Sequence, residues 1–199
     1  MTTQLSPHFT LEELDGVAAP SGVQSSLRFT ANKMEAFREI IGTAFVVTSG
    51  YRTPQHNAEV GGSETSDHVN GLALDGHFSG RTMWQVYNRL MVLKRAGGLP
   101  AFDQIILYPY TTGHIHFGFG GKMRGDVMAK LIDGSYSPVT SAIEYAMPGW
   151  GGPPIGPGTS QSMQPQTLPV LLEEDNNLGL YIAGGITVLA GLLAWLWNR

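Results

Sequence analysis

Apolar residues in the first part of the chain recur at helical spacing and then at strand spacing. Between residues 27 and 41, large apolar side chains return near helical spacing, which predicts a core helix. Residues 44–49 are rich in β-branched and aromatic side chains, and residues 72–78 form another short apolar run, so both are expected to be strands. Thr10 and Glu13 have the spacing of a capping box, which predicts that a short helix begins at Thr10.

The pattern continues with one more helix and two more strands. A stripe of Met, aromatic and aliphatic side chains within residues 81–96 predicts a second core helix. Residues 103–108 and 114–119 are predicted strands, and the segment between them favours an antiparallel hairpin with a longer loop. The fold class expected for residues 1–147 is therefore α+β, with a small antiparallel sheet and flanking helices.

The composition changes sharply after residue 147. Residues 148–170 are rich in Pro and Gly and poor in apolar side chains, which is typical of a partly extended linker, and we place this linker at residues 148–177. Residues 178–197 contain no charged side chain. At about 1.5 Å per residue they are long enough to cross a hydrocarbon layer of about 30 Å, so we predict a C-terminal transmembrane helix.

The flanks of this apolar segment predict its orientation. Acidic residues 173–175 precede it and Arg199 follows it, so the positive-inside tendency places Arg199 in the cytoplasm. The domain is then expected on the extracytoplasmic side of a membrane, or exposed in a virion. Small residues also repeat every four positions along one face, which could pack in a homo- or hetero-oligomer or could simply face lipid. They are Gly179, Ala183, Thr187 and Gly191.

Charge and cysteine content exclude several classes of protein. The chain has 12 Lys and Arg against 16 Asp and Glu, a net charge of −4, with no basic cluster of the kind that binds nucleic acid. It has no Cys, which excludes a disulfide framework and a thiolate metal site. The first residues lack the basic start and apolar core of a signal peptide, so export is expected to use another route.

One stretch, from Ser66 to Asp75, carries the clearest candidate chemistry. It sets His68 and Asp75 seven residues apart around a loop-compatible Asn-Gly, and His116 follows about forty residues later. A catalytic zinc ion takes three protein ligands, typically His nitrogens and one carboxylate oxygen, and leaves a fourth position to water. His68, Asp75 and His116 therefore form a candidate zinc site where a loop runs into a strand.

Further motifs surround these residues in a consistent order. They are Ser49-Gly50-Tyr51-Arg52, His56-Asn57, Gly61-Gly62, Ser66-x-His68-x-x-Gly71-x-Ala73-x-Asp75 and an opening segment from His8 to Leu14. With the late His116, they resemble the zinc D-Ala-D-Ala carboxypeptidase and L-alanyl-D-glutamate endopeptidase family, and its short phage-type members most closely. The resemblance covers roughly residues 6–125. It implies a peptidoglycan-cleaving fold with Zn²⁺ held by His68, Asp75 and His116.

Two polar residues near the candidate ligands are candidates for binding substrate. The resemblance implies that Arg52 contacts substrate, and the rigid fork of an Arg at a strand end can hold a carboxylate or a carbonyl. A surface ion pair of Arg52 with Glu59 or Glu64 is the alternative. Ser66 could hydrogen-bond either substrate or the backbone of its own loop.

The catalytic base is the place where the chain departs from the resembled family. Peptide hydrolysis needs a group that takes the proton of the attacking water and returns it to the leaving amine. In the family this is usually an acidic residue shortly before the last His, yet no carboxylate lies between Asp103 and His116. His114 is one candidate, because residues two apart on a strand share a face, and Asp103 is another if the hairpin folds it inward. Alternatively, His114 only lines the cleft.

Two functions follow from these observations. The leading hypothesis is a membrane-anchored zinc peptidase, encoded by a phage or carried in a virion, that cleaves the stem peptides of peptidoglycan. The alternative is a protein with a peptidase fold but weak or lost hydrolysis, which binds peptidoglycan as a structural component of a virion or envelope.

Overall fold

The computed structural model describes residues 2–109 and 113–139. The predicted linker, 148–177, and the predicted transmembrane helix, 178–197, lie outside these residues. Within the described ranges, no helix combines the length and the apolar character needed to cross a membrane.

The described chain begins with two short strands, continues with helices interspersed with β3 and β4, and ends with four strands in succession. In order, the elements are β1 (Gln4–Ser6), β2 (Phe9–Thr10), α1 (Ser21–Ile41), β3 (Phe45–Ser49), α2 (Pro54–Glu59), the 3₁₀ turn η1 (Asp67–Asn70), β4 (Ala73–Phe78), α3 (Met83–Arg95), β5 (Gln104–Leu107), β6 (Ile115–Gly118), β7 (Asp126–Lys130) and β8 (Tyr136–Pro138). A six-stranded sheet has the order β3-β4-β6-β5-β7-β8, while β1 and β2 form a separate ribbon. The expected α+β class and the expected antiparallel hairpin of β5 and β6 are confirmed, and only the β5–β7 pair is parallel.

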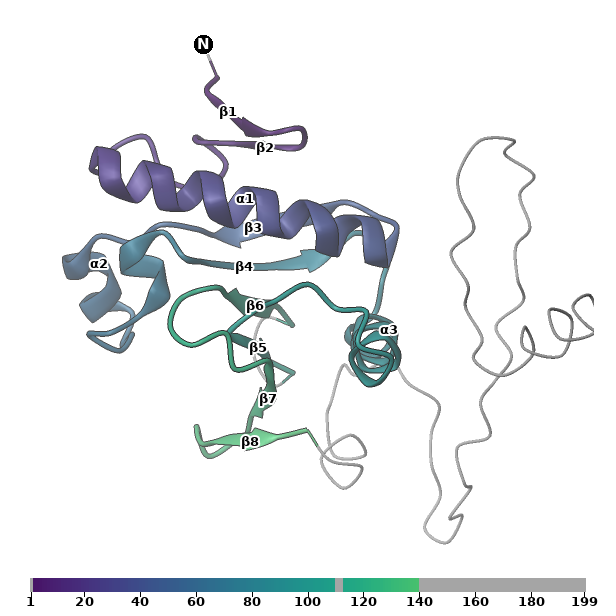
Figure 1. Ribbon diagram of the computed structural model, residues 1–199. Coiled ribbons are helices and arrows are strands. Elements are labelled where there is room, and N and C mark those ends of the chain that lie inside the picture. The colour runs from purple at the N-terminus through teal and green to yellow at the C-terminus, as the bar shows by residue number, and fades with distance from the viewer. Residues whose placement is uncertain (1, 110–112, 140–199) are drawn as a thin grey trace, which may run out of the picture. The chain divides into compact units, whose positions relative to one another are not determined.

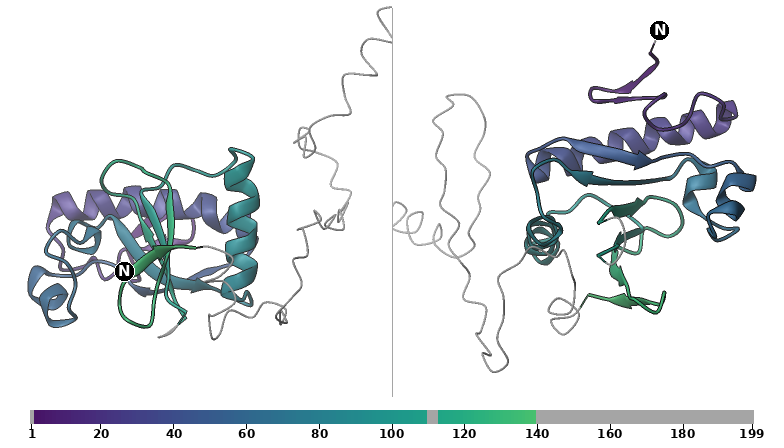
Figure 2. Two further views of the ribbon diagram at one scale, coloured as in Figure 1. Left: turned by 90° about the horizontal axis from the view of Figure 1, so that it is seen from below. Right: turned by 180° about the vertical axis from the view of Figure 1, so that it is seen from behind.

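Helix α1 covers the sheet near β3 and β4, with the β1–β2 ribbon on its other side (Figure 1). Its buried side chains follow helical spacing, so one face of the helix enters the core. Helices α2 and α3 lie toward opposite ends of the sheet (Figure 2). Helix α3 starts with a capping box between Thr82 and Gln85, and Gly42 ends α1 in a left-handed conformation.

An aromatic cluster joins α1 to the sheet. The Phe37 side chain is fully buried, and its ring centroid lies 5.0 Å from that of Phe117 and 6.1 Å from those of Phe102 and Phe119. Phe117 alternates along β6 with His116, so the strand buries one side chain in this cluster and turns the next toward the opposite face. The core therefore fixes the strand that carries the last candidate ligand.

Replacing Phe37 by alanine tests this cluster. The variant is expected to lose about 3–5 kcal/mol of unfolding free energy, because it removes buried ring contacts and leaves a cavity. Phe29 on the same helix is 40% exposed and provides the control. Phe29→Ala should cost less than about 1 kcal/mol. Chemical denaturation of both variants measures the difference, and equal losses would contradict the assigned core.

The N-terminal segment corrects one sequence-based prediction. The capping-box contacts form as expected: Thr10 Oγ1 accepts from the Glu13 amide at 3.2 Å, and Glu13 Oε2 accepts from the Thr10 amide at 3.4 Å. No helix follows, however, and residues 11–15 form turns instead. Asp15 has a φ of 55° and so interrupts any helical run. The turns let both Leu11 and Leu14 reach the core.

Candidate metal centre

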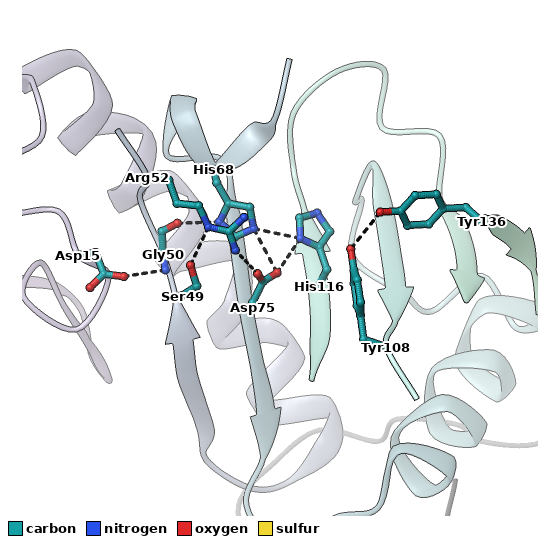
Figure 3. Close-up of polar contacts among 9 residues, drawn as sticks. All are labelled: Asp15, Ser49, Gly50, Arg52, His68, Asp75, Tyr108, His116 and Tyr136. Carbon is teal, nitrogen blue, oxygen red and sulfur yellow. Dashed lines mark hydrogen bonds and ion pairs between the residues drawn. The ribbon is translucent and has the colours of Figure 1, made fainter. Parts of the chain in front are cut away.

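The structure brings His68, Asp75 and His116 together (Figure 3). His68 lies on η1, while Asp75 on β4 and His116 on β6 are direct cross-strand partners. The Nδ1 atom of His116 lies 2.8 Å from Oδ1 of Asp75, and Nε2 of His68 lies 3.1 Å from the same oxygen. The two imidazole nitrogens are 3.2 Å apart. All three residues are at most 7% exposed, so the cluster is buried.

The backbone of Gly50 sets the tautomer of His68. The Nδ1 atom of His68 lies 2.6 Å from the carbonyl oxygen of Gly50, which can only accept a hydrogen bond. Nδ1 must therefore carry the proton, and in the neutral ring the lone pair of Nε2 faces Asp75 and His116. A Cβ at Gly50 would lie 2.3 Å from the carbonyl oxygen of Leu14, so this close crossing of two backbones requires glycine.

Arg52 holds the second oxygen of Asp75. Its Nη2 donates to Oδ2 of Asp75 at 2.5 Å, and its Nε donates to Oγ of Ser49 at 3.0 Å. Burial opposes ionisation of Asp75, but its close contacts with the imidazoles of His116 and His68 prevail and hold the pKa of its carboxyl well below its usual range. Asp75 is therefore an anion with Oδ1 directed at the two imidazoles.

This donor set fits a zinc ion. Two imidazole nitrogens and one carboxylate oxygen are ligands that catalytic zinc takes, and no thiolate is needed. Tetrahedral ligands about 2.1 Å from zinc lie about 3.4 Å from one another. The three donor atoms here are 2.8–3.2 Å apart, so a small outward movement would accommodate the ion. A buried lone pair of His68 that faces a carboxylate also favours a cation between them.

His114 lies beside the cluster and packs against Tyr108. The two rings are stacked, with centroids 4.2 Å apart and an angle of 20° between their planes. The hydroxyl of Tyr108 lies 3.4 Å from that of Tyr136 on β8. Burial lowers the pKa of His114, while the nearby Asp75 carboxylate opposes this shift. A half-buried imidazole that favours its neutral form can accept a proton near the cluster.

The carboxylate of Asp103 forms an ion pair with Arg124. It is buried at the start of β5, and its two oxygens accept from Nε and Nη2 of Arg124 at 3.1 and 2.8 Å. The hydrogen bond from Arg124 lowers the pKa of Asp103, against the effect of burial. A carboxylate held in this way by a guanidinium is a weak proton acceptor, so the geometry favours His114 of the two candidate bases.

The pH dependence of stability tests this ion pair. Because the folded-state pKa of Asp103 is lowered, its stabilising effect should be present above the unfolded-state value of 3.8 and be lost as the pH falls through the folded-state value. Asp103→Asn should therefore lower the unfolding free energy at pH 7, and the difference from the unmodified protein should shrink below pH 3.8. Urea denaturation from pH 3 to pH 7 measures this. A difference that stays constant across the range would contradict the assignment.

The structure also places the candidate substrate-binding residues and shows one polar residue that sequence reasoning missed. Arg52 pairs with Asp75, and neither Glu59 nor Glu64 is its partner in the described chain. Ser66 directly precedes η1 and does not cap it through its side chain. The missed residue is Asp67, whose Oδ2 accepts from the Gly120 amide at 3.3 Å and whose pKa is raised by burial. Its position directly before His68 was the available signal.

The buried cluster of His68 on η1, Asp75 on β4 and His116 on β6 could hold a single metal ion, with the donor types that hydrolytic zinc sites use. A family model described as Peptidase M15 matches residues 7–117, more than half of the chain. The chain therefore belongs to the peptidase M15 family, whose members are zinc-dependent metallopeptidases that act on peptidoglycan, and the resemblance identified from the motifs is confirmed. A comparison with curated proteins gave no match.

Proposed function

We propose that this protein is a zinc peptidase that hydrolyses stem peptides of peptidoglycan, with the ion held by His68, Asp75 and His116. The observation that carries the proposal is the buried cluster of three donor atoms, all within 3.2 Å of one another, in a chain of this family. The proposal includes anchoring of the domain through residues 178–197, on the extracytoplasmic side of a membrane or in a virion of phage origin.

The metal and the protein contribute different parts of the chemistry. Zinc bound at such a site polarises a carbonyl and makes water nucleophilic near neutral pH. His114 is the residue that takes a proton and returns it to the leaving amine, because its neutral form is favoured and it lies next to the cluster. The stack on Tyr108 limits the rotation of the His114 ring.

Arg52 and Ser66 position the reacting groups. Arg52 orients Asp75 through Oδ2 and leaves Oδ1 to the metal, so in this proposal its contact with substrate is made with the N–H groups that Asp75 and Ser49 do not occupy. Ser66 is half-buried and directly precedes η1, where its hydroxyl can hydrogen-bond a peptide group of the substrate.

A second candidate function is binding of peptidoglycan without turnover. The observation that favours it is the pairing of Asp103 with Arg124, which makes this carboxylate a weak proton acceptor. In that case zinc would retain a structural role, and the protein would serve as a wall-binding component of a virion or envelope.

Digestion of purified sacculi distinguishes the two functions. The full-length protein, purified in detergent and loaded with zinc, is incubated with sacculi, and the released muropeptides are identified by mass. Turnover that disappears with chelator and returns with zinc supports the peptidase and names the bond that is cut. Equal products with and without chelator, or none at any zinc concentration, overturn the peptidase. Sacculus binding that persists without turnover supports the second function.

A further inference from the structure

The two ring nitrogens of His116 lie in different environments. Its Nδ1 points to the donor cluster, as described above, while its Nε2 is buried and has no hydrogen-bond partner among residues 2–109 and 113–139. A buried polar nitrogen without a partner is energetically unfavourable. When the Nδ1 of a neutral His binds a metal, Nε2 must carry the ring proton, so this nitrogen needs an acceptor.

A carboxylate lies across a small gap from this nitrogen. A Cβ built on Gly118 would lie 3.1 Å from Oδ2 of Asp67 and 3.2 Å from Nε2 of His116. Both atoms therefore border the same space, which is open because residue 118 has no side chain. A Cβ on Gly120 would lie 2.1 Å from Oδ1 of Asp67, so the carboxylate rests directly on the backbone that follows β6.

We propose that Asp67 is the positioning residue for His116. When the centre holds its ion, a small movement across the gap beside Gly118 brings this carboxylate to the Nε2 proton of His116, and the contact selects the tautomer in which Nδ1 is free to bind the metal. Asp67 would thus serve His116 as the Gly50 carbonyl serves His68: in each case an acceptor on one side of the ring directs the lone pair of the other nitrogen into the centre. The inference rests on the proposed metal centre and adds the acceptor that orients its last ligand.

A purely structural role for Asp67 makes a different prediction. Its hydrogen bond to the Gly120 amide joins η1 to the segment after β6, and loss of that bond alone would lower stability without changing the tautomer of His116. Asparagine tests the role in orienting His116. The Oδ2 atom of Asp67 both accepts from the Gly120 amide and borders Nε2 of His116, so asparagine places either a neutral oxygen or an NH2 group there. The neutral oxygen is a weaker acceptor than a carboxylate, and the NH2 group would donate to Nε2 and favour the wrong tautomer.

The experiment compares Asp67→Asn and Asp67→Ala with the unmodified full-length protein in three measurements. Zinc affinity is measured by competition with a chromophoric chelator, the His116 tautomer by imidazole ¹⁵N chemical shifts, and stability by urea denaturation without metal. Both variants are expected to bind zinc about 10–100-fold more weakly. In Asp67→Asn, the Nε2 signal of His116 should also move toward the unprotonated form. Asp126→Asn, which alters a half-exposed carboxylate on β7, is the control.

Gly118→Ala tests the same contact without altering either partner. The added methyl group would enter the space between Asp67 and His116, so zinc affinity should again fall about 10–100-fold. Gly98→Ala is its control, because the nearest atom to a Cβ there is 3.6 Å away, on Leu93. If the unmodified protein binds no zinc, the metal centre and this inference both fail. If it binds zinc and Asp67→Asn matches it in affinity and tautomer, only this inference is overturned.

Discussion

Replacing His116 by alanine is expected to abolish stoichiometric zinc binding and to reduce hydrolysis of peptidoglycan by about a thousandfold or more. The variant removes one of three donor atoms, and the remaining pair, Nε2 of His68 and Oδ1 of Asp75, cannot close a three-ligand site. The fold should survive, because the aromatic cluster lies on the opposite face of β6 and Asp75 keeps its ion pair with Arg52. Zinc content after dialysis and muropeptide release measure the two effects.

His77 provides the matched control for this substitution. It lies on β4, two residues beyond Asp75, and its side chain is exposed. His77→Ala should therefore retain one zinc ion per chain and full turnover. A His116→Ala variant that still holds zinc and cleaves sacculi at the original rate would show that the centre lies elsewhere.

Much of the fold could be predicted because its signals are local. The spacing of apolar residues predicted α1, α3 and the strands β3 to β6, and each of these elements is present. Their bounds agree within a few residues, except that α1 begins at Ser21, six residues before its expected start. The parallel strand β7 and the short β8 were missed. The side chains of β7 are only partly buried, apart from Ala129, so the segment lacks the alternating pattern that identifies a strand.

The candidate centre was predictable in its members but not in its supporting contacts. The spacing of His68 and Asp75, together with a late His116, was sufficient to propose a zinc site. The pairing of Asp75 with His116 depends on the register between β4 and β6, which no local pattern encodes. The ion pairs of Arg52 with Asp75 and of Arg124 with Asp103 join residues more than twenty positions apart. Only the folded chain shows that the carboxylate of Asp103 is paired with Arg124.

Replacing His114 by glutamine is expected to lower kcat about 10²–10⁴-fold while zinc binding is retained. Glutamine is similar in size to histidine and can still pack against Tyr108, but it cannot take up a proton at neutral pH. The three metal donors are unchanged, so the loss should appear in kcat, with a smaller effect on KM. Rates of muropeptide release over a range of substrate concentrations separate the two parameters, and zinc content is measured on the same samples.

The result also decides between the two roles considered for His114. If the ring only lines the cleft, glutamine should change KM by a small factor and leave kcat within about threefold, because a remote contact that binds substrate and transition state equally does not alter the chemical step. His77→Gln, an exposed substitution of the same kind on β4, provides the reference rate. A large loss of kcat in His114→Gln with full zinc content, together with an unchanged kcat in His77→Gln, would identify His114 as the proton acceptor. The other candidate base, Asp103, is paired with Arg124.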